Sequence, residues 1–334
     1  MKDIYMKKNL KSVVKKPLSK SVKRRNFVLT ASVAAAYASM RYTPAQAMGY
    51  VDDAKNYFNP EEQVPLILNP GTVMRLDYVD TSLGQIHYRH KKGSSNYAPI
   101  VCLHQTASSA AMFEKFAAAY NGPESIYAID TPGFGGSFDP LNTPTMSEYA
   151  DTILEAIKGL GYEKVHLFGH HTGASIAIEI ANNNPENVSS LMMIGPVVLT
   201  AEERTLFGQV YPKPFEPKAD GSHLKVMWDY VESIGGNSSL DLHHREMVDT
   251  ARAWQGHIKM YQKIWDQDFS AMYQNISVPM LIMCAEKDIL WPMFDRAKEM
   301  RPDAIAKVIP GTNFEPDEAP FETAEAIKSY LADL

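Results

Sequence analysis

The stretch KVHLFGHHTGASIAIEIA, residues 164–181, decides the fold. It begins with a short apolar run that predicts a β-strand and ends in an Ala- and Ile-rich segment that predicts a helix. Gly169 and Gly173 flank the junction, which leaves room for strand and helix to pass close to each other. The residue at the tip of so sharp a turn is held at positive φ, and histidine is among the non-glycine residues that tolerate it. The sequence therefore predicts a tight strand–turn–helix with His171 at its tip.

The N-terminus reads as an export signal. Residues 1–25 carry ten Lys and Arg, the apolar run FVLTASVAAAYASM follows, and Ala45-Gln46-Ala47 supplies a small-residue cleavage site. Arg24 and Arg25 stand just before the apolar run and resemble the twin-arginine export motif. A mitochondrial-type presequence is the alternative, although such segments lack this cleavage site. We expect residues 1–47 to be removed from a periplasmic or secreted protein.

The mature chain is acidic. Residues 1–47 hold eleven of the 33 basic and one of the 39 acidic residues, so their removal leaves a net charge of −16. Such a surface repels nucleic acid and anionic lipid. We therefore expect a small-molecule substrate, no nucleic-acid partner and no membrane association after cleavage; the oligomeric state is not predicted.

The rest of the chain alternates strands and helices, and 45% of the residues of the full chain are hydrophobic, enough for a large core. A helix over residues 145–161 with a Thr145–Glu148 capping box separates two apolar strands, which indicates a parallel sheet. Cys102 and Cys284 lie within apolar runs and read as core residues. The predicted strands are RLDYVD (75–80), QIHYRH (85–90), APIVCLH (98–104), SIYAID (125–130), KVHLFG (164–169), SSLMMIGPVV (189–198) and VPMLIMCAEKD (278–288).

Residues 199–275 differ from the rest in composition. They are rich in Trp, Tyr, Met and His and read as helices interrupted by GGNSS. A helical insertion over the carboxyl ends of parallel strands would form a cap, although a satellite of packed helices explains the same pattern. We predict a core of residues 48–198 and 276–334 with a helical cap of residues 199–275 inserted before the penultimate strand region.

Five segments, in this order, resemble the α/β-hydrolase fold superfamily, and the resemblance covers nearly all of residues 74–332. It implies a mostly parallel, doubly wound α/β sheet with a helical cap. The segments are VCLHQTASS (101–109), AIDTPGFGGSFDP (128–140), VHLFGHHTGA (165–174), PMLIMCAEKDILWP (279–292) and VIPGTNFEPDEAPFETAEAI (308–327).

The resemblance also implies catalytic positions, and two of them depart from the family pattern. The family's nucleophile elbow, G-x-S-x-G, reads G-H-H-T-G here, so its serine falls on His171. The acid falls on Asp288, and the catalytic histidine falls on Asn313. Main-chain N–H groups of Thr106 and Thr172 correspond to the oxyanion hole.

Four further residues are expected near the pocket: His104, Gln105, His170 and Trp228. Gln105 stands where the family usually has glycine. Ser175, one helical turn beyond the tip, should point along its helix and away from the pocket, so we do not expect it to replace the nucleophile.

A histidine at the tip of the turn can act without a second catalytic histidine. A free imidazole, with a pKa of about 6.5, is largely neutral and nucleophilic at pH 7, whereas serine needs a neighbouring base. Replacing serine by His171 thus removes the need for the second histidine, which is Asn313 here. We expect Asp288 to accept a hydrogen bond from the Asn313 amide, whose carbonyl accepts one from His171, and His171 to act as general base or as nucleophile, with the base role favoured.

The sequence favours an exported enzyme that hydrolyses an apolar or aromatic ester, lactone or related carbonyl compound, without a cofactor or metal. Three alternatives remain open: a degenerate, ligand-binding hydrolase-like protein, a non-hydrolytic lyase or isomerase, and a metal-dependent enzyme. The metal alternative uses His104, His170 and His171 with further ligands drawn from His223, His243, His244 and Asp130.

Overall fold

The computed structural model describes residues 74–94, 96–213 and 215–334. The predicted export signal and the start of the predicted core, residues 48–73, lie outside these ranges. Among the described residues, no helix is both long and apolar enough to cross a lipid bilayer.

Eight strands form one sheet in the order β1-β2-β4-β3-β5-β6-β7-β8. The hairpin of β1 and β2 is antiparallel, β2 pairs antiparallel with β4, and the other neighbours are parallel. This arrangement confirms the mostly parallel sheet. The strands are β1 (Arg75–Asp80), β2 (Gln85–Lys91), β3 (Ile100–Leu103), β4 (Ile126–Ile129), β5 (Val165–His170), β6 (Val188–Ile194), β7 (Met280–Cys284) and β8 (Ile305–Val308).

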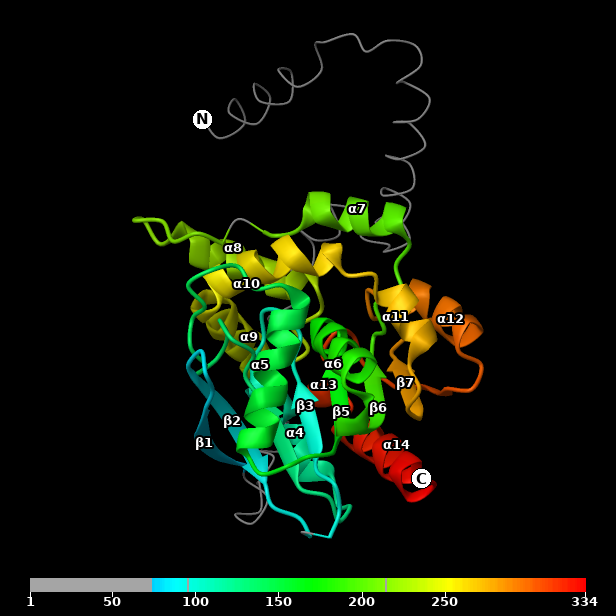
Figure 1. Cartoon of the computed structure of the whole chain (residues 1–334). Helices are drawn as coiled ribbons and strands as arrows, with labels where there is room; N and C mark the ends of the chain where they lie inside the picture. Colours follow the sequence, from blue (N-terminus) through cyan, green and yellow to red (C-terminus); the bar gives the residue numbers. More distant parts are fainter. Residues whose placement is uncertain (1–73, 95, 214) are drawn as a thin grey trace, which may run out of the picture. The chain divides into compact units, whose positions relative to one another are not determined.

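Helices cover both faces of the sheet (Figure 1). Strand β3 shows why, because Val101 and Leu103 enter one hydrophobic cluster while Ile100 and Cys102 enter the other. The first cluster also holds residues of α5 (Met146–Gly159), α6 (Thr172–Asn183), α11 (Phe269–Asn275) and α12 (Trp291–Met300); the second holds residues of η1 (Ala110–Phe113), α4 (Glu114–Ala119) and α14 (Pro320–Ala332).

Two local predictions are confirmed. Helix α5 begins at the Thr145–Glu148 capping box, in which each side chain bonds the backbone of the other residue. Cys102 and Cys284 are free and buried in the core.

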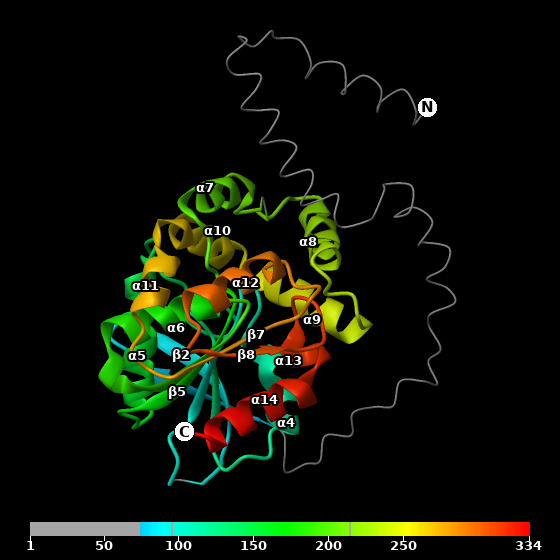
Figure 2. The same cartoon turned by 90° about the vertical axis from the view of Figure 1, so that its right-hand side faces the viewer.

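A helical cap stands at one end of the sheet (Figures 1 and 2). Of the helices in predicted cap residues 199–275, α11 contacts α6 and so covers the sheet rather than belonging to the cap. The cap elements are α7 (Ala201–Val210), α8 (Ser222–Ser233), α9 (Leu240–Arg252), α10 (Trp254–Lys263) and η3 (Ile264–Asp266).

Buried polar contacts fasten α9 to the core. Arg245 forms two hydrogen bonds with the Asp317 carboxylate, of 2.8 and 2.6 Å. Asp317 lies on α13 (Glu315–Glu318). Glu246 accepts a hydrogen bond of 2.9 Å from Ser108, in the loop after β3. Helix α9 of the cap is therefore bonded both to α13 and to the loop after β3.

The same interface predicts a pH-dependent stability. The pKa of Asp249 is raised to about 7, mainly by burial. The neighbouring Glu246 carboxyl also raises this pKa, and its effect is larger than the lowering by the hydrogen bond from Ser109. Between its ordinary value and pH 7 the folded protein therefore holds more protons on Asp249 than the unfolded chain, so this group makes stability fall as pH rises through that window. We expect Asp249→Asn to raise the melting temperature at pH 8 and to leave it nearly unchanged at pH 4.5.

Thermal melts of both proteins between pH 4.5 and 9 measure this difference. Asp241→Asn, at an exposed position of the same helix, is the matched control and should show no such pH dependence. A difference in melting temperature between Asp249→Asn and the parent that stays constant from pH 4.5 to 9 would contradict the prediction.

Candidate active site

The sharp turn between β5 and α6 places His171 at a tip. His171 has φ 48° and ψ −109°, and it is the one non-glycine residue at positive φ in the described ranges. A Cβ on Gly169 would stand 2.5 Å from the Ala174 Cα, and one on Gly173 would stand 2.0 Å from the Leu103 carbonyl oxygen. The two flanking glycines are therefore required by close backbone approach, as the sequence predicted.

His171 pairs directly with Asp288. Its Nε2 lies 2.7 Å from the Asp288 Oδ2, and the two side chains are 11% and 0% exposed. The main-chain N–H of Leu290 donates to the other carboxylate oxygen over 2.6 Å, which fixes the orientation of the carboxylate. Because a carboxylate accepts hydrogen bonds, Nε2 carries the proton of a neutral ring and Nδ1 keeps a lone pair.

Gly195 makes room for the ring. It follows β6 at φ +63°, and a Cβ at this position would lie 2.4 Å from Cδ2 and 2.7 Å from Nε2 of His171. The Cδ2–Nε2 edge of the imidazole thus faces Gly195, and Nδ1 lies on the opposite edge. Within the described residues, the hydrogen bond of the His171 ring is made by Nε2 and none is made by Nδ1.

A second imidazole–carboxyl pair lies against the first. The His170 ring stacks on the His171 ring with centroids 4.3 Å apart and planes 11° from parallel, and His170 Nε2 is 2.9 Å from the Glu315 Oε2. Burial, reinforced by Asp288, raises the pKa of Glu315 well above its usual range, and burial lowers the pKa of His170 well below its usual range. Both shifts favour the uncharged forms of the two side chains, in which Glu315 keeps its proton and His170 does not gain a second one.

His170, His171 and Glu315 also form the one candidate metal cluster of the described ranges, with ligand atoms within 4.8 Å of one another. This set differs from the predicted alternative, which combined His104 with the two neighbouring histidines. In the stacked arrangement the lone pairs of the two rings lie in nearly parallel planes, and both Nε2 atoms bond carboxyl oxygens. The geometry suits hydrogen bonding better than two nitrogens that converge on one ion.

The two predicted oxyanion residues are adjacent but bonded to each other. The Thr106 main-chain N–H donates to the Thr172 Oγ1 over 2.7 Å, and the two hydroxyl oxygens are 3.0 Å apart. Thr172 opens α6, where first-turn N–H groups have no partner within the helix. The Thr172 N–H is thus available to an oxyanion, whereas the Thr106 N–H is engaged.

The predicted relay through Asn313 is wrong. The Asn313 amide nitrogen donates to the Ile234 carbonyl over 2.5 Å, and its oxygen accepts from the Ile289 N–H over 3.0 Å. An imidazole reaches farther from the backbone than a serine hydroxyl, so His171 spans the gap to Asp288 without an intermediary. Asn313 instead joins the end of α8 to the loop that carries Asp288.

Three of the other predicted pocket residues are structural. His104 is buried and neutral, because its Nδ1–H donates to the Gln105 carbonyl and its Nε2 accepts from the Thr131 N–H. The Gln105 side chain donates to the Asn313 carbonyl over 2.9 Å. Trp228 packs on the ring of His243 in the cap. None of the three lines the cavity beside His171.

That cavity has a volume of about 60 Å³ and lies between the tip of the turn and the cap. It is small against the ~300–1,000 Å³ of most ligand sites, so a substrate enters only as cap side chains shift. The cap contributes mainly aromatic residues to its wall: Phe207, Tyr211, Tyr261 and Trp265.

Comparison with known proteins identifies the family. A family model described as "alpha/beta hydrolase fold" matches residues 98–312, more than half of the chain. The chain belongs to the alpha/beta hydrolase family.

Relatives within the family carry several names. A fluoroacetate dehalogenase from Burkholderia sp. is 21% identical over 265 residues, which cover 70% of this chain and 87% of that protein. The carboxylesterase YbfK of Bacillus subtilis is 25% identical over 244 residues, which cover 70% and 79%. The crystal structure of an enol-lactonase from Burkholderia xenovorans LB400 superposes with a TM-score of 0.65 at 16% identity, over 77% of this chain and 100% of that one.

Sequence reasoning missed two residues of this alpha/beta hydrolase site. Glu315 stands in NFEPDEAP, directly after the segment that carries Asn313, and a carboxyl so close to a predicted catalytic position was a usable signal. Gly195 lies within the predicted strand SSLMMIGPVV, but nothing in the sequence signals that a side chain at this position would collide with the His171 ring.

Gly195→Ala tests how the alpha/beta hydrolase turn holds its histidine. We expect the added methyl group to displace the His171 ring and break its hydrogen bond to Asp288. The far-downfield proton NMR signal of the Nε2–H group measures that bond directly, and it should vanish or shift strongly in the variant.

Gly221→Ala is the matched control. Gly221 also has positive φ, +72°, but a Cβ there meets nothing within 4 Å. Both variants share the backbone strain of a left-handed alanine, so both should lose some thermal stability, while only Gly195→Ala should change the His171 signal. An unchanged signal in Gly195→Ala would contradict the assigned ring position.

Proposed function

We propose that the protein hydrolyses small apolar or aromatic esters or lactones, with His171 as the general base. The observation that carries the proposal is the 2.7 Å bond between His171 Nε2 and Asp288 at the tip of the turn, beside a cavity that His171 helps to line. The same observation speaks against the degenerate, ligand-binding alternative, because the ring is oriented by a buried carboxylate and faces open space.

The chemistry follows from the tautomer. With Nε2–H bound to Asp288, the lone pair of Nδ1 takes a proton from a water molecule that attacks the substrate carbonyl. The imidazolium formed in this step stays paired with the Asp288 carboxylate, which stabilises it. Nδ1 then returns the proton to the leaving oxygen. We favour a base over a nucleophile because an acyl-imidazole is itself labile.

The His170–Glu315 pair, which stacks against His171, supports the general-base assignment. Because burial favours the uncharged forms of Glu315 and His170, neither side chain adds a charge that competes with Asp288 for the His171 proton. The substrate class rests on the aromatic wall of the cavity and on the names of the carboxylesterase and the enol-lactonase to which the chain is similar.

One observation favours a second candidate, a lyase or isomerase that moves a proton without acyl transfer. The Thr106 N–H is engaged by the Thr172 hydroxyl, so only one of the two expected oxyanion donors is available. Hydrolysis through a tetrahedral intermediate benefits from both donors, whereas proton abstraction from a C–H or O–H group needs the base alone.

Export remains part of the proposal. The basic segment, the short apolar run and Ala45-Gln46-Ala47 support a cleaved signal, and Arg24 with Arg25 supports a twin-arginine route to the periplasm or the exterior. The N-terminal sequence of the protein recovered from its native host would show whether it begins after residue 47.

Initial rates with phenyl esters and small lactones test the proposed activity. We expect His171→Ala and Asp288→Asn each to lower kcat by about a hundredfold or more, which is the usual contribution of a general base. His244→Ala, on the exposed side of α9, is the matched control and should leave the rates unchanged. A serine-directed fluorophosphonate should not label the protein.

Two outcomes would overturn the assignment. Full activity of His171→Ala would remove the base, and labelling by the fluorophosphonate would place a serine nucleophile elsewhere. Exchange of substrate C–H hydrogens with D₂O in the absence of hydrolysis would favour the proton-transfer enzyme over the hydrolase.

A further inference from the structure

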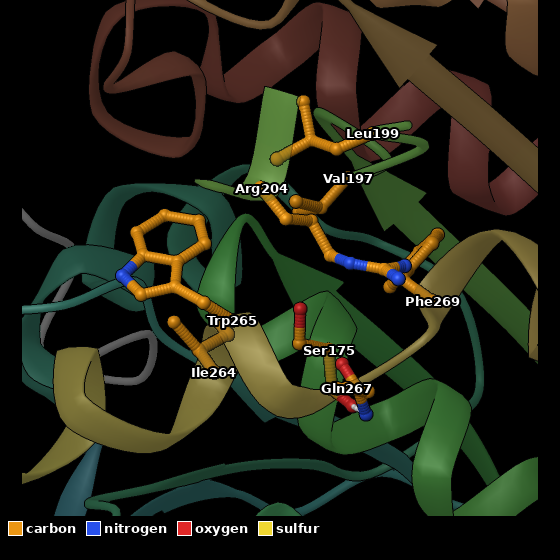
Figure 3. A pocket seen from close by; sticks show the side chains of 8 residues that line it. All are labelled: Ser175, Val197, Leu199, Arg204, Ile264, Trp265, Gln267 and Phe269. Atoms are coloured by element: carbon orange, nitrogen blue, oxygen red, sulfur yellow. Dashed lines mark hydrogen bonds between the residues drawn. The ribbon is translucent and has the colours of Figure 1, made fainter. Parts of the chain in front are cut away.

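A buried hydroxyl group without a partner lies close to the proposed base. Ser175 sits on α6, one turn after His171, and is fully buried, yet its Oγ has no hydrogen-bond partner. Figure 3 shows the hydroxyl pointing from α6 into a small cavity below Val197 and Leu199. It does not line the cavity beside His171, as the sequence predicted, but it lines the adjoining one. Buried hydroxyl groups are ordinarily satisfied, so this one calls for a partner.

Gln267 presents a second unpaired group to the same cavity. Its amide nitrogen donates to the Ser175 carbonyl oxygen over 2.9 Å and to the Glu179 carboxyl over 2.6 Å. Because both neighbours are acceptors, the orientation of the amide is fixed and its other atom, Oε1, is an oxygen. Oε1 is buried and has no partner.

This cavity adjoins the proposed catalytic one. The two share four lining residues, Val197, Leu199, Ile264 and Trp265. An apolar wall therefore leads from His171 to the Ser175 hydroxyl. A substrate whose reacting carbon lies beside His171 would extend along this wall and place its far end at Ser175.

The unpaired atoms specify the chemistry of that far end. Ser175 can donate and accept a hydrogen bond, whereas Gln267 Oε1 can only accept. A hydroxyl group satisfies both, because it accepts from Ser175 and donates to Gln267. A carboxylate would face the Gln267 oxygen with the Glu179 carboxyl behind it, and the Arg204 guanidinium at the cavity already pairs with Asp268 over 2.8 Å.

We propose that this cavity is a subsite that binds a hydroxyl group at the end of an apolar or aromatic arm of the substrate. The identification of this arm as part of a substrate rests on the proposed function. The preference of the cavity for a hydroxyl group does not rest on it. The test therefore measures binding and needs no turnover.

Ligand-detected NMR titrations with phenol, fluorobenzene and benzoate test the preference. Phenol and fluorobenzene have nearly the same size, but fluorine cannot donate a hydrogen bond. We expect phenol to bind at least about tenfold more tightly than fluorobenzene, a ratio that corresponds to ~1.4 kcal/mol. Ser175→Ala and Gln267→Met should each remove most of the difference while leaving fluorobenzene binding unchanged.

Ser190→Ala is the matched control, since Ser190 is also fully buried but its hydroxyl bonds His166 of β5, near the start of β6. It should retain the preference for phenol. Equal binding of phenol and fluorobenzene, tighter binding of benzoate, or no binding of any of the three would overturn the subsite.

His171→Ala separates this proposal from the proposed function. The subsite is intact in that variant, so phenol should keep its advantage even though hydrolysis is lost. If His171→Ala retains hydrolysis while phenol retains its advantage, the general base is wrong and the subsite stands. If His171→Ala loses both hydrolysis and the phenol preference, the preference arises at His171 and the subsite is wrong.

Discussion

The positive-φ turn at His171 is the constraint on which the site depends. Gly169 has no room for a side chain because the start of α6 lies against it, and Gly173 has none because the end of β3 lies against it, so the chain turns sharply at His171 between them. The tip residue consequently points across the end of the sheet toward the loop that carries Asp288. The imidazole of His171 is long enough to reach the Asp288 carboxylate, with 2.7 Å between Nε2 and Oδ2.

The electrostatics of the site follow from that contact. Two imidazoles stack and each bonds a carboxyl, but the pairs differ in their protons. Burial favours the uncharged forms of His170 and Glu315, and the Asp288 carboxylate, which bonds Nε2 of His171, is the acceptor that sets the tautomer of His171. The His170 ring packs flat against one face of the His171 ring, and Gly195, which has no side chain, leaves room for the Cδ2–Nε2 edge of His171. Rigid support on these sides makes the remaining edge, with Nδ1, the reactive one.

Much of the fold and part of the site could be predicted from the sequence. Period and spacing predicted the sheet, the hairpin, the capped helix α5 and the cap, because each depends on local chemistry that the sequence displays. His171 and Asp288 follow from motif positions. The Asn313 relay was wrong because it assumed that the serine geometry persists around a larger side chain. Trp228 was misplaced because an aromatic residue in a cap packs internally as readily as it lines a cavity, and helix periodicity does not separate these cases.

The central claim is that Asp288 holds His171 as the Nε2–H tautomer with a free lone pair on Nδ1. Nitrogen-15 NMR of the histidine side chains, with His171 assigned by its absence in His171→Ala, measures this directly at pH 8. The account predicts a protonated, pyrrole-type Nε2 and an unprotonated, pyridine-type Nδ1, with the two types exchanged or averaged in Asp288→Asn. A His171 that carries its proton on Nδ1 in the parent protein would contradict it.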